Sequence, residues 1–263
     1  MASAETSVPR LRLEIRQHVA WLTLGQLERP TVLDEALARE LVEAAALIGT
    51  DREVRCVVLT GAGKAFALGA DIEQIEANTV EQNLHYNRRL RDAADALAAL
   101  PVPTIAALGG HAIGGGLELA LACTLRIAAA GAKLGMPEAR LGILPATGGV
   151  ARLPRLVGTA TAARLLLTGD LIDAAEAARL GVVDTVVARE ALAAEAQQLA
   201  ERIATAAPLS VRALVAALRE DELAIDAANA RTELRLADLL GSADRTEGAR
   251  AFIERREPEF EGR

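Results

Sequence analysis

Glu118 is the residue whose surroundings most favour chemistry. It lies in the apolar segment GGGLELALAC, and on a helix its nearest neighbours are Gly114, Gly115, Leu121 and Ala122. A carboxyl group on such a face is difficult to hydrate, so burial would raise its pKa and suit it to proton transfer near neutral pH. The same pattern is compatible with a glutamate that leaves the helix early and reaches solvent or a salt bridge.

A run of three glycines, Gly114-Gly115-Gly116, precedes Glu118 and follows a buried strand in the pattern. Its N–H groups would point outward at the start of a helix, where the macrodipole favours negative charge. Such a turn suits a negatively charged oxygen, although glycine runs also occur in mobile loops.

A second glycine turn, Leu68-Gly69-Ala70-Asp71, also lies between a strand and a helix. Its amides could face the same cleft as the first turn, which would bring two backbone donors together. The alternative is an ordinary helix start in which Asp71 caps the segment IEQIEA.

Glu138 directly follows Pro137 in the segment GMPEARLGILP, at the first turn of a short helix or in a loop. Together with Glu118 it offers two carboxyl groups for acid and base catalysis. Spacing alone favours an exposed glutamate here, and periodicity does not bring the two side chains together. The three histidines lack metal-ligand spacing, and the chain contains neither a G-x-S-x-G elbow nor a nucleotide-binding loop, so we predict no metal site.

Composition narrows the classes of function. The net charge of −7 at pH 7 disfavours a protein that binds nucleic acid, and the most apolar region, 104–130, is interrupted by charged residues and glycines. We therefore expect neither a nucleic-acid partner nor a membrane span. Cys56 and Cys123 lie in apolar runs, and the first ten residues do not resemble a secretory signal. These features favour a reducing cytoplasm.

The periodicities predict an α/β protein. Strand patterns in LRLEI, VAWLTL, RCVVLTG and PTIAALGG alternate with helical patterns such as DEALARELVEAAALI, for which Asp34 is a plausible N-cap. HAIGGGLELALAC is predicted to be a glycine turn that opens a helix, and Gly181 is placed to end a later helix. We predict an α/β core that carries the active site over residues 1–200 and a helical region over 201–263.

Six segments in this order resemble the enoyl-CoA hydratase (crotonase) superfamily over most of the chain, from Val19 to Phe260. The segments are VVLTGAGKAFALGADI, PTIAALGGHAIGGGLELALAC, LGMPEARLGILPATGGVARLPRLVG, LLLTGD, DAAEAARLGVVD and EGARAFIERREPEF. The resemblance implies a crotonase-like spiral of ββα repeats, with a helical C-terminal region that builds homotrimers and often homohexamers.

The resemblance also implies a site for an acyl-CoA thioester. By position, it gives the catalytic roles to Glu118 and Glu138, and the two amides of an oxyanion hole to Ala70 and Gly115. Acyl-CoA is then the substrate, and no cofactor is needed. The residues expected to contact it are Lys64, Ala67, Leu68, Gly69, Asp71, Ile72, Gly114 and Ala146. Candidate walls of the acyl pocket are Ile72, Ile75, Met136, Leu141 and Phe252.

The implied reaction is syn hydration of a trans-2-enoyl-CoA to a 3-hydroxyacyl-CoA. The alternatives are an enoyl-CoA isomerase that uses Glu138 alone, a specialised lyase acting on acyl-CoA or acyl carrier protein, and a scaffold without activity. The usual Asn-Arg-Pro near the CoA site is replaced by Gly25-Gln26-Leu27, and the usual Asn-Ala by Thr31-Val32. Ala146 stands where the family has glycine, and these departures favour a specialised substrate.

Overall fold

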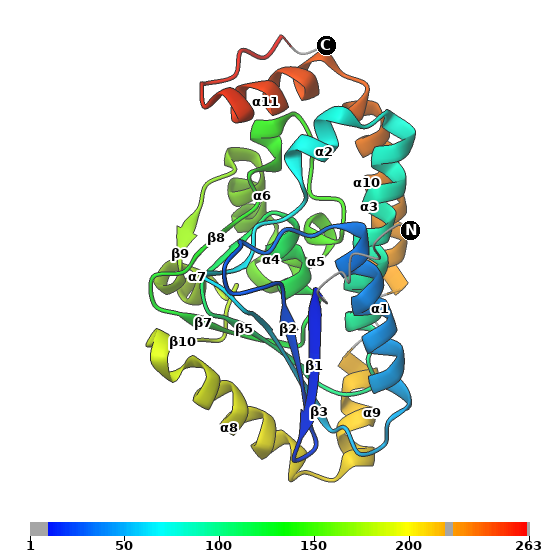
Figure 1. Cartoon of the computed structure of the whole chain (residues 1–263), viewed down its shortest axis with the longest axis vertical. Helices are drawn as coiled ribbons and strands as arrows, with labels where there is room; N and C mark the ends of the chain where they lie inside the picture. The colour runs from blue at the N-terminus through cyan, green and yellow to red at the C-terminus, as the bar shows by residue number, and fades with distance from the viewer. Residues whose placement is uncertain (1–9, 219–222, 262–263) are drawn as a thin grey trace, which may run out of the picture.

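The computed structural model describes residues 10–218 and 223–261, in which ten strands form two sheets. Figure 1 shows the strands at the centre of the molecule, with α8 and α11 toward opposite ends of its longest axis. The larger sheet contains, in spatial order, β1 (Leu11–Arg16), β2 (Val19–Leu24), β3 (Cys56–Gly61), β5 (Thr104–Leu108), β7 (Leu125–Ala129) and β10 (Thr185–Val187). The smaller sheet contains β4 (Ala65–Ala67), β6 (His111–Ile113), β8 (Lys133–Gly135) and β9 (Ile172–Asp173).

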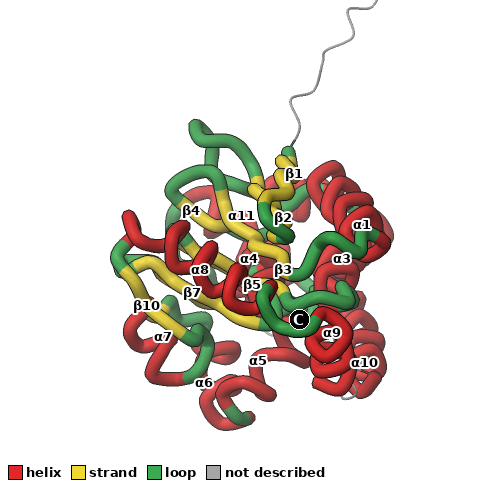
Figure 2. Tube along the Cα trace, turned by 90° about the horizontal axis from the view of Figure 1, so that it is seen from below, coloured by secondary structure: helices red, strands yellow, loops and turns green. Residues whose placement is uncertain are grey.

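Helices surround both sheets, and Figure 2 shows α1, α3, α9 and α10 gathered on one side and α5, α6 and α7 on another. The helices of the first two thirds are α1 (Glu35–Thr50), α2 (Ile72–Ala77), α3 (Val80–Ala98), α4 (Gly115–Leu121), the 3₁₀ helix η1 (Pro137–Leu141), α5 (Gly149–Val157), α6 (Thr159–Thr168) and α7 (Ala174–Leu180). The remaining ones are the 3₁₀ helix η2 (Arg189–Ala191), α8 (Leu192–Ala204), α9 (Pro208–Leu218), α10 (Leu223–Leu240) and α11 (Ala243–Glu254).

Successive strands alternate between the two sheets. β3, β5 and β7 enter the larger sheet, and each is followed by a short strand, β4, β6 or β8, that enters the smaller one. Strands β2, β3, β5, β7 and β10 are parallel, whereas β1 pairs antiparallel with β2. The predicted α/β spiral of ββα repeats is therefore confirmed.

The larger sheet is covered on both faces, as the period of two in its strands requires. In β3, Val57 and Leu59 join the main core, while Cys56 and Val58 face a second core closed by α8. Both cysteines are free and buried, and burial raises the pKa of the Cys56 thiol to about 12.

Several local predictions are confirmed and one is wrong. Asp34 caps α1 by accepting a hydrogen bond from the Leu37 N–H, and Gly181 ends α7 with a left-handed φ of 83°. The glycine turn at Gly114 opens α4 as predicted, but residues His111–Ile113 before it form strand β6 and not part of the turn, because they pair with β4 and β8 of the neighbouring repeats. The predicted division at residue 200 lies within α8, and a boundary between two regions stays a prediction.

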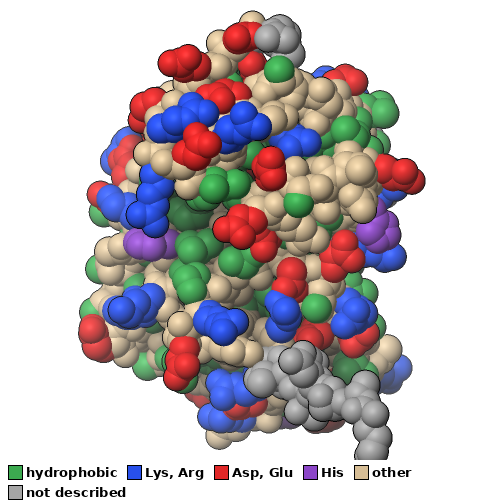
Figure 3. Space-filling model, turned by 45° about the horizontal axis from the view of Figure 1, so that its top comes forward, with side chains coloured by type: hydrophobic (Ala, Val, Ile, Leu, Met, Phe, Trp, Pro, Cys, Tyr) green, Lys and Arg blue, Asp and Glu red, His purple; other side chains and the backbone are tan. Residues whose placement is uncertain are grey.

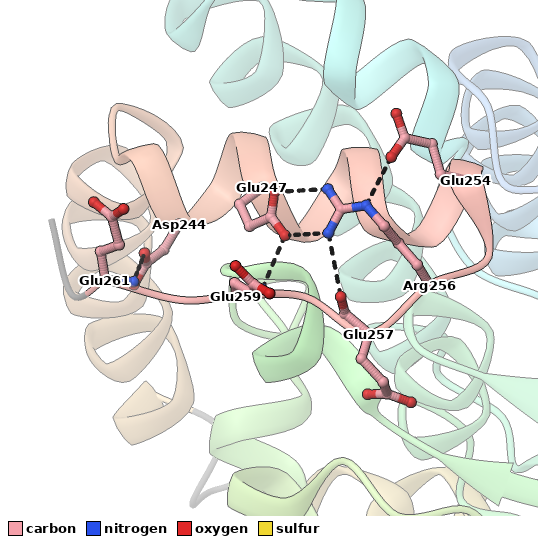
Figure 4. Close-up of polar contacts among 7 residues, drawn as sticks. All are labelled: Asp244, Glu247, Glu254, Arg256, Glu257, Glu259 and Glu261. Atoms are coloured by element: carbon pink, nitrogen blue, oxygen red, sulfur yellow. Dashed lines mark hydrogen bonds and ion pairs between the residues drawn. The ribbon is translucent and has the colours of Figure 1, made fainter.

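The C-terminal segment folds back along α11 (Figure 4). Arg256 donates to both carboxylate oxygens of Glu247, at 2.6 and 2.9 Å, and holds the pKa of that carboxyl down to about 2. The Glu259 N–H donates to the same carboxylate, and the Glu261 N–H donates to Asp244. These bonds fasten the segment after α11 to the outer side of that helix.

The link between β5 and β6, where the chain passes from the larger to the smaller sheet, contains Gly109 and Gly110. Its packing predicts how alanine at each position would affect stability. A Cβ atom on Gly110 would fall well inside van der Waals contact with the Lys64 carbonyl oxygen, whereas one on Gly109 would make an ordinary contact of 3.5 Å with Leu192. Gly110→Ala should therefore lower the free energy of unfolding by at least about 2 kcal/mol, and Gly109→Ala by less than about 1 kcal/mol. Urea denaturation measures both, and equal effects would contradict this account of the crossing.

Candidate active site

Two buried carboxyl groups line one cavity. Glu118 lies in the middle of α4 with 2% of its surface exposed, and Glu138 lies in η1 with 8% exposed. Both belong to the lining of a cavity between α2, α3, η1 and α10. The structure thus brings together two glutamates whose meeting the sequence pattern alone could not predict.

Glu118 is held by three hydrogen bonds. Its Oε1 accepts from the backbone N–H groups of Thr147 and Gly149, at 2.9 and 2.7 Å, and its Oε2 accepts from the Thr147 hydroxyl at 2.5 Å. Burial raises the pKa of this carboxyl, while the three donors and the nearby Arg152 act in the opposite direction. These donors favour the ionised form, so Glu118 is placed to accept a proton.

Glu138 has the opposite environment. Its Oε2 is buried without a hydrogen-bond partner among the described residues. Burial, followed by repulsion from Glu118, raises its pKa well above the ordinary value of a glutamate. A carboxyl group of this kind keeps its proton to a higher pH and can donate it. The pair therefore combines a proton acceptor with a proton donor.

Gly114 and Gly116 of the triple run have separate structural reasons. Gly114 has a φ of +54°, and a Cβ atom on it would lie 2.8 Å from Glu138 Oε1. A Cβ atom on Gly116 would collide with the carbonyl oxygen of Ala67 at the end of β4. The N–H of Gly114 donates to the Gly135 carbonyl oxygen, which ties the start of α4 to the end of β8. The run is thus a close-packed junction of α4 with β4, β8 and Glu138.

The two predicted backbone donors, Ala70 and Gly115, converge on the cavity. A Cβ atom on Gly69 would lie 3.2 Å from the Gly115 nitrogen, and one on Gly115 would lie 3.9 Å from the Ala70 nitrogen. Neither N–H donates to another residue in the described part of the chain, and both residues line the cavity. Two free N–H groups this close can stabilise one negatively charged oxygen.

The residues predicted to contact the substrate fall into two groups. The cavity lining includes Leu68, Gly69, Ile72, Gly114 and Ala146. The other three do not belong to it: Lys64 is exposed at a separate surface hollow, Ala67 is fully buried, and Asp71 caps α2 through its side chain. Among the candidate pocket walls, Ile72, Ile75, Leu141 and Phe252 line the cavity, whereas Met136 is buried outside its lining.

Two polar residues of the site escaped the sequence analysis. Thr147 supplies two of the three donors to Glu118, yet it is a single threonine in a loop and no local pattern marks it. Tyr86 of α3 accepts a hydrogen bond from the Asp71 N–H and donates to the Leu33 carbonyl oxygen, which fixes the turn that contains Ala70. The one signal in the sequence was that Tyr86 is its single tyrosine and lies in a polar helical segment.

The C-terminal helix α11 supports the segment that carries Glu138. Gly142, which ends η1 with a φ of +70°, lies so close to α11 that a Cβ atom on it would be 2.6 Å from the Arg245 nitrogen. A Cβ atom on Gly248 of α11 would be 2.6 Å from the carbonyl carbon of Leu141. Two glycines therefore allow the backbones of η1 and α11 to touch, which restricts the movement of Glu138.

Other kinds of site have little support in the described residues. No group of three or more His, Cys, Asp or Glu side chains in residues 10–218 and 223–261 could hold a metal ion. No helix there is long and apolar enough to cross a membrane. The face shown in Figure 3 carries basic and acidic side chains intermixed, so it offers no uniformly basic surface.

Comparison with known proteins shows which family this chain is similar to. The family model described as enoyl-CoA hydratase/isomerase matches residues 14–263. The chain is 42% identical to (E)-benzylidenesuccinyl-CoA hydratase of Thauera aromatica, over 95% of this chain and 98% of that protein. It is 36% identical to 2,3-dehydroadipyl-CoA hydratase of Escherichia coli, over 94% of this chain and 97% of that protein. A crystal structure of an enoyl-CoA hydratase from Bacillus anthracis has a TM-score of 0.79 and 36% identity, covering 97% of this chain and 100% of that one.

The raised pKa values of both carboxyl groups give a prediction on stability. A carboxyl group whose pKa is higher in the folded state stabilises the fold below the ordinary pKa, and this contribution is lost as the pH rises through the raised value. Glu138→Gln should therefore raise the free energy of unfolding at pH 8 by more than about 1.4 kcal/mol, the equivalent of one pKa unit, and change it little near pH 4.5.

Glu118→Gln is the matched control for this effect. Its gain at pH 8 should be smaller, because glutamine loses the charge that the Thr147 and Gly149 donors stabilise. Chemical denaturation at the two pH values measures both variants. A Glu138→Gln protein no more stable than the parent at pH 8 would contradict the proposed state of that carboxyl group.

Proposed function

The chain belongs to the enoyl-CoA hydratase/isomerase family, and from this premise we propose that it is an enoyl-CoA hydratase. It adds water syn across the double bond of a trans-2-enoyl-CoA and gives a 3-hydroxyacyl-CoA. The observation that carries the proposal is the pair of unlike carboxyl groups, Glu118 and Glu138, in one cavity beside two free amide donors. An isomerase needs only one such group.

The two carboxyl groups divide the proton transfers. Glu118, which three donors hold toward the ionised form, removes a proton from a water molecule as its oxygen attacks C3 of the substrate. Glu138, whose pKa burial raises, delivers its proton to C2. Each turnover moves one proton onto Glu118 and one away from Glu138, and exchange between them restores the starting state.

The amides of Ala70 and Gly115 bind the thioester oxygen. Attack of water on C3 moves negative charge onto that oxygen, and two N–H groups without other acceptors stabilise it more in the transition state than in the ground state. Proton transfer and charge stabilisation together account for the reaction, so the proposal requires no metal or redox cofactor.

Acyl-CoA is the proposed partner of this cavity. Leu68, Gly69, Ile72, Gly114 and Ala146 of its lining are proposed to contact the acyl thioester. Exposed Lys64, together with Ala67 and Asp71, is assigned to the CoA side by resemblance alone. Two buried free cysteines support a reducing compartment, and we keep the cytoplasm as the proposed location.

We further propose that the chain forms a homotrimer or homohexamer through its helical region. Leu214 and Leu218 lie four residues apart on one face of α9 and are 63% and 75% exposed, and Leu234 of α10 is 71% exposed. Exposed leucines on these helices favour contact with another subunit.

The catalytic assignment predicts the behaviour of two variants. Glu118→Gln and Glu138→Gln are nearly isosteric, and each should lower kcat for crotonyl-CoA hydration by about 10²- to 10⁴-fold, because each removes one positioned acid or base. The double variant should be little worse than the poorer single one, since both groups act on one event. Loss of absorbance of crotonyl-CoA measures the rate.

Glu195→Gln, on the exposed outer face of α8, is the matched control and should leave the rate unchanged. An isomerase would behave differently: with a 3-enoyl-CoA, Glu118→Gln would keep most activity while Glu138→Gln lost it. If the parent hydrates crotonyl-CoA and Glu118→Gln hydrates it equally fast, Glu118 is not the base.

The proposed assembly predicts a trimer or hexamer by light scattering at micromolar concentration. Replacing Leu214 and Leu218 together by Asp should shift the protein toward smaller species, because charge cannot be buried in such a contact without a partner. A parent protein that is a single monomeric species would show that this helical region does not build the assembly.

A further inference from the structure

The part of the cavity beyond the two carboxyl groups has an apolar wall. Helices α2, α3 and α10 and the loop before α5 all contribute to it. The side chains that form most of this wall are Ile75, Leu90, Ile143, Leu144, Leu236 and Leu240. Leu236 and Leu240 are 4% and 3% exposed, so the wall is part of a packed cluster and not a loose surface.

Most neutral polar side chains of this wall already form hydrogen bonds with other residues of the protein. Asn83 donates to the Ile75 carbonyl oxygen at 2.8 Å and accepts from the Asn78 side chain at 3.2 Å. The Tyr86 hydroxyl both donates and accepts within the fold. Asn87 makes one long hydrogen bond, 3.4 Å, to the Ala146 carbonyl oxygen. The Asn87 side chain thus has hydrogen-bonding capacity left for a ligand.

No Lys, Arg or His side chain lines the cavity among residues 10–218 and 223–261. Three arginines near this wall bind other groups of the protein. Arg88 and Arg91 of α3 both pair with Glu233 of α10, at 2.6 Å. Arg245 is buried behind the wall and donates to the carbonyl oxygens of Leu240 and Glu76.

We propose that this site selects acyl groups whose far end is uncharged and apolar, and that it discriminates against acyl groups that end in a second carboxylate. The selection rests on the proposed hydratase function and names its substrate class. A terminal carboxylate would enter a cavity with no cation in its described lining, and the charged side chains of that lining are Glu118 and Glu138. It would lose its hydration and meet repulsion, whereas an alkyl or aryl end would gain burial against Leu236 and Leu240.

A matched pair of substrates tests the selection. trans-2-Hexenoyl-CoA and 2,3-dehydroadipyl-CoA have the same six carbons and differ only in the methyl or carboxylate at the far end. The purified full chain should hydrate the first with a kcat/KM about tenfold or more above that for the second. Equal values, or a preference for the dehydroadipyl thioester, would overturn the proposal.

A pair of variants tests whether charge sets the preference. Asn87→Lys places a cation at the wall, and Asn87→Met removes the same hydrogen bond to Ala146 without adding charge. The ratio of the two kcat/KM values within each variant cancels any general loss of rate. Asn87→Lys should bring the ratio toward one, while Asn87→Met should keep it at least as high as in the parent. The same ratio in both variants would overturn the electrostatic explanation.

Binding separates this proposal from the proposed reaction. Hexanoyl-CoA and adipyl-CoA lack the double bond, so calorimetry with the parent protein compares their affinities without turnover. Tighter binding of hexanoyl-CoA supports the selection even if crotonyl-CoA is not hydrated, in which case the hydratase proposal alone fails. Equal affinity for the two thioesters, or tighter binding of adipyl-CoA, overturns the selection whatever the rate of hydration.

Discussion

The burial of two carboxyl groups beside one cavity is the constraint on which the rest of this structure depends. Glu118 and Glu138 repel each other when both are ionised, and each has lost the water that would stabilise its charge. Three donors from Thr147 and Gly149 offset part of that cost at Glu118, whereas Glu138 Oε2 has no partner in the described residues. Burial of the pair costs stability at neutral pH, and the difference in hydrogen bonding makes Glu118 the better proton acceptor and Glu138 the better proton donor.

Alternation of strands between two sheets makes this burial possible. Each repeat sends one long strand into the larger sheet and one short strand into the smaller, so the ends of β4, β6 and β8 lie side by side although they are far apart in sequence. The turns after β4 and β6 then bring Ala70 and Gly115 together, and Gly116 can approach Ala67 only because it has no side chain. The amides and the carboxyl groups therefore depend on the same close packing.

Local signals predicted the features that depend on neighbours along the chain. The long strands, the Asp34 and Asp71 caps and the end of α7 at Gly181 follow from periodicity and capping, and Glu118 stood out because its helix face is apolar. The burial of Glu138 could not be predicted locally, since α11 packs against η1 from a distant part of the chain and Gly114, before α4, lies beside the Glu138 carboxyl group. Thr147 and the three-residue strand β6 carried no pattern, because their roles exist only once the repeats are stacked.

The two faces of α10 have different surroundings. Leu236 and Leu240, one turn apart, point into the cavity and close its apolar wall, while Leu234 is 71% exposed on the other side of the helix. The ion pairs from Glu233 to Arg88 and Arg91 fix the same helix to α3, whose Tyr86 holds the turn of Ala70. A subunit that packed against the exposed face would press on a helix that forms the acyl wall. Acyl selection and subunit contact would then be coupled through the position of one helix, because an interior packed this closely transmits small displacements.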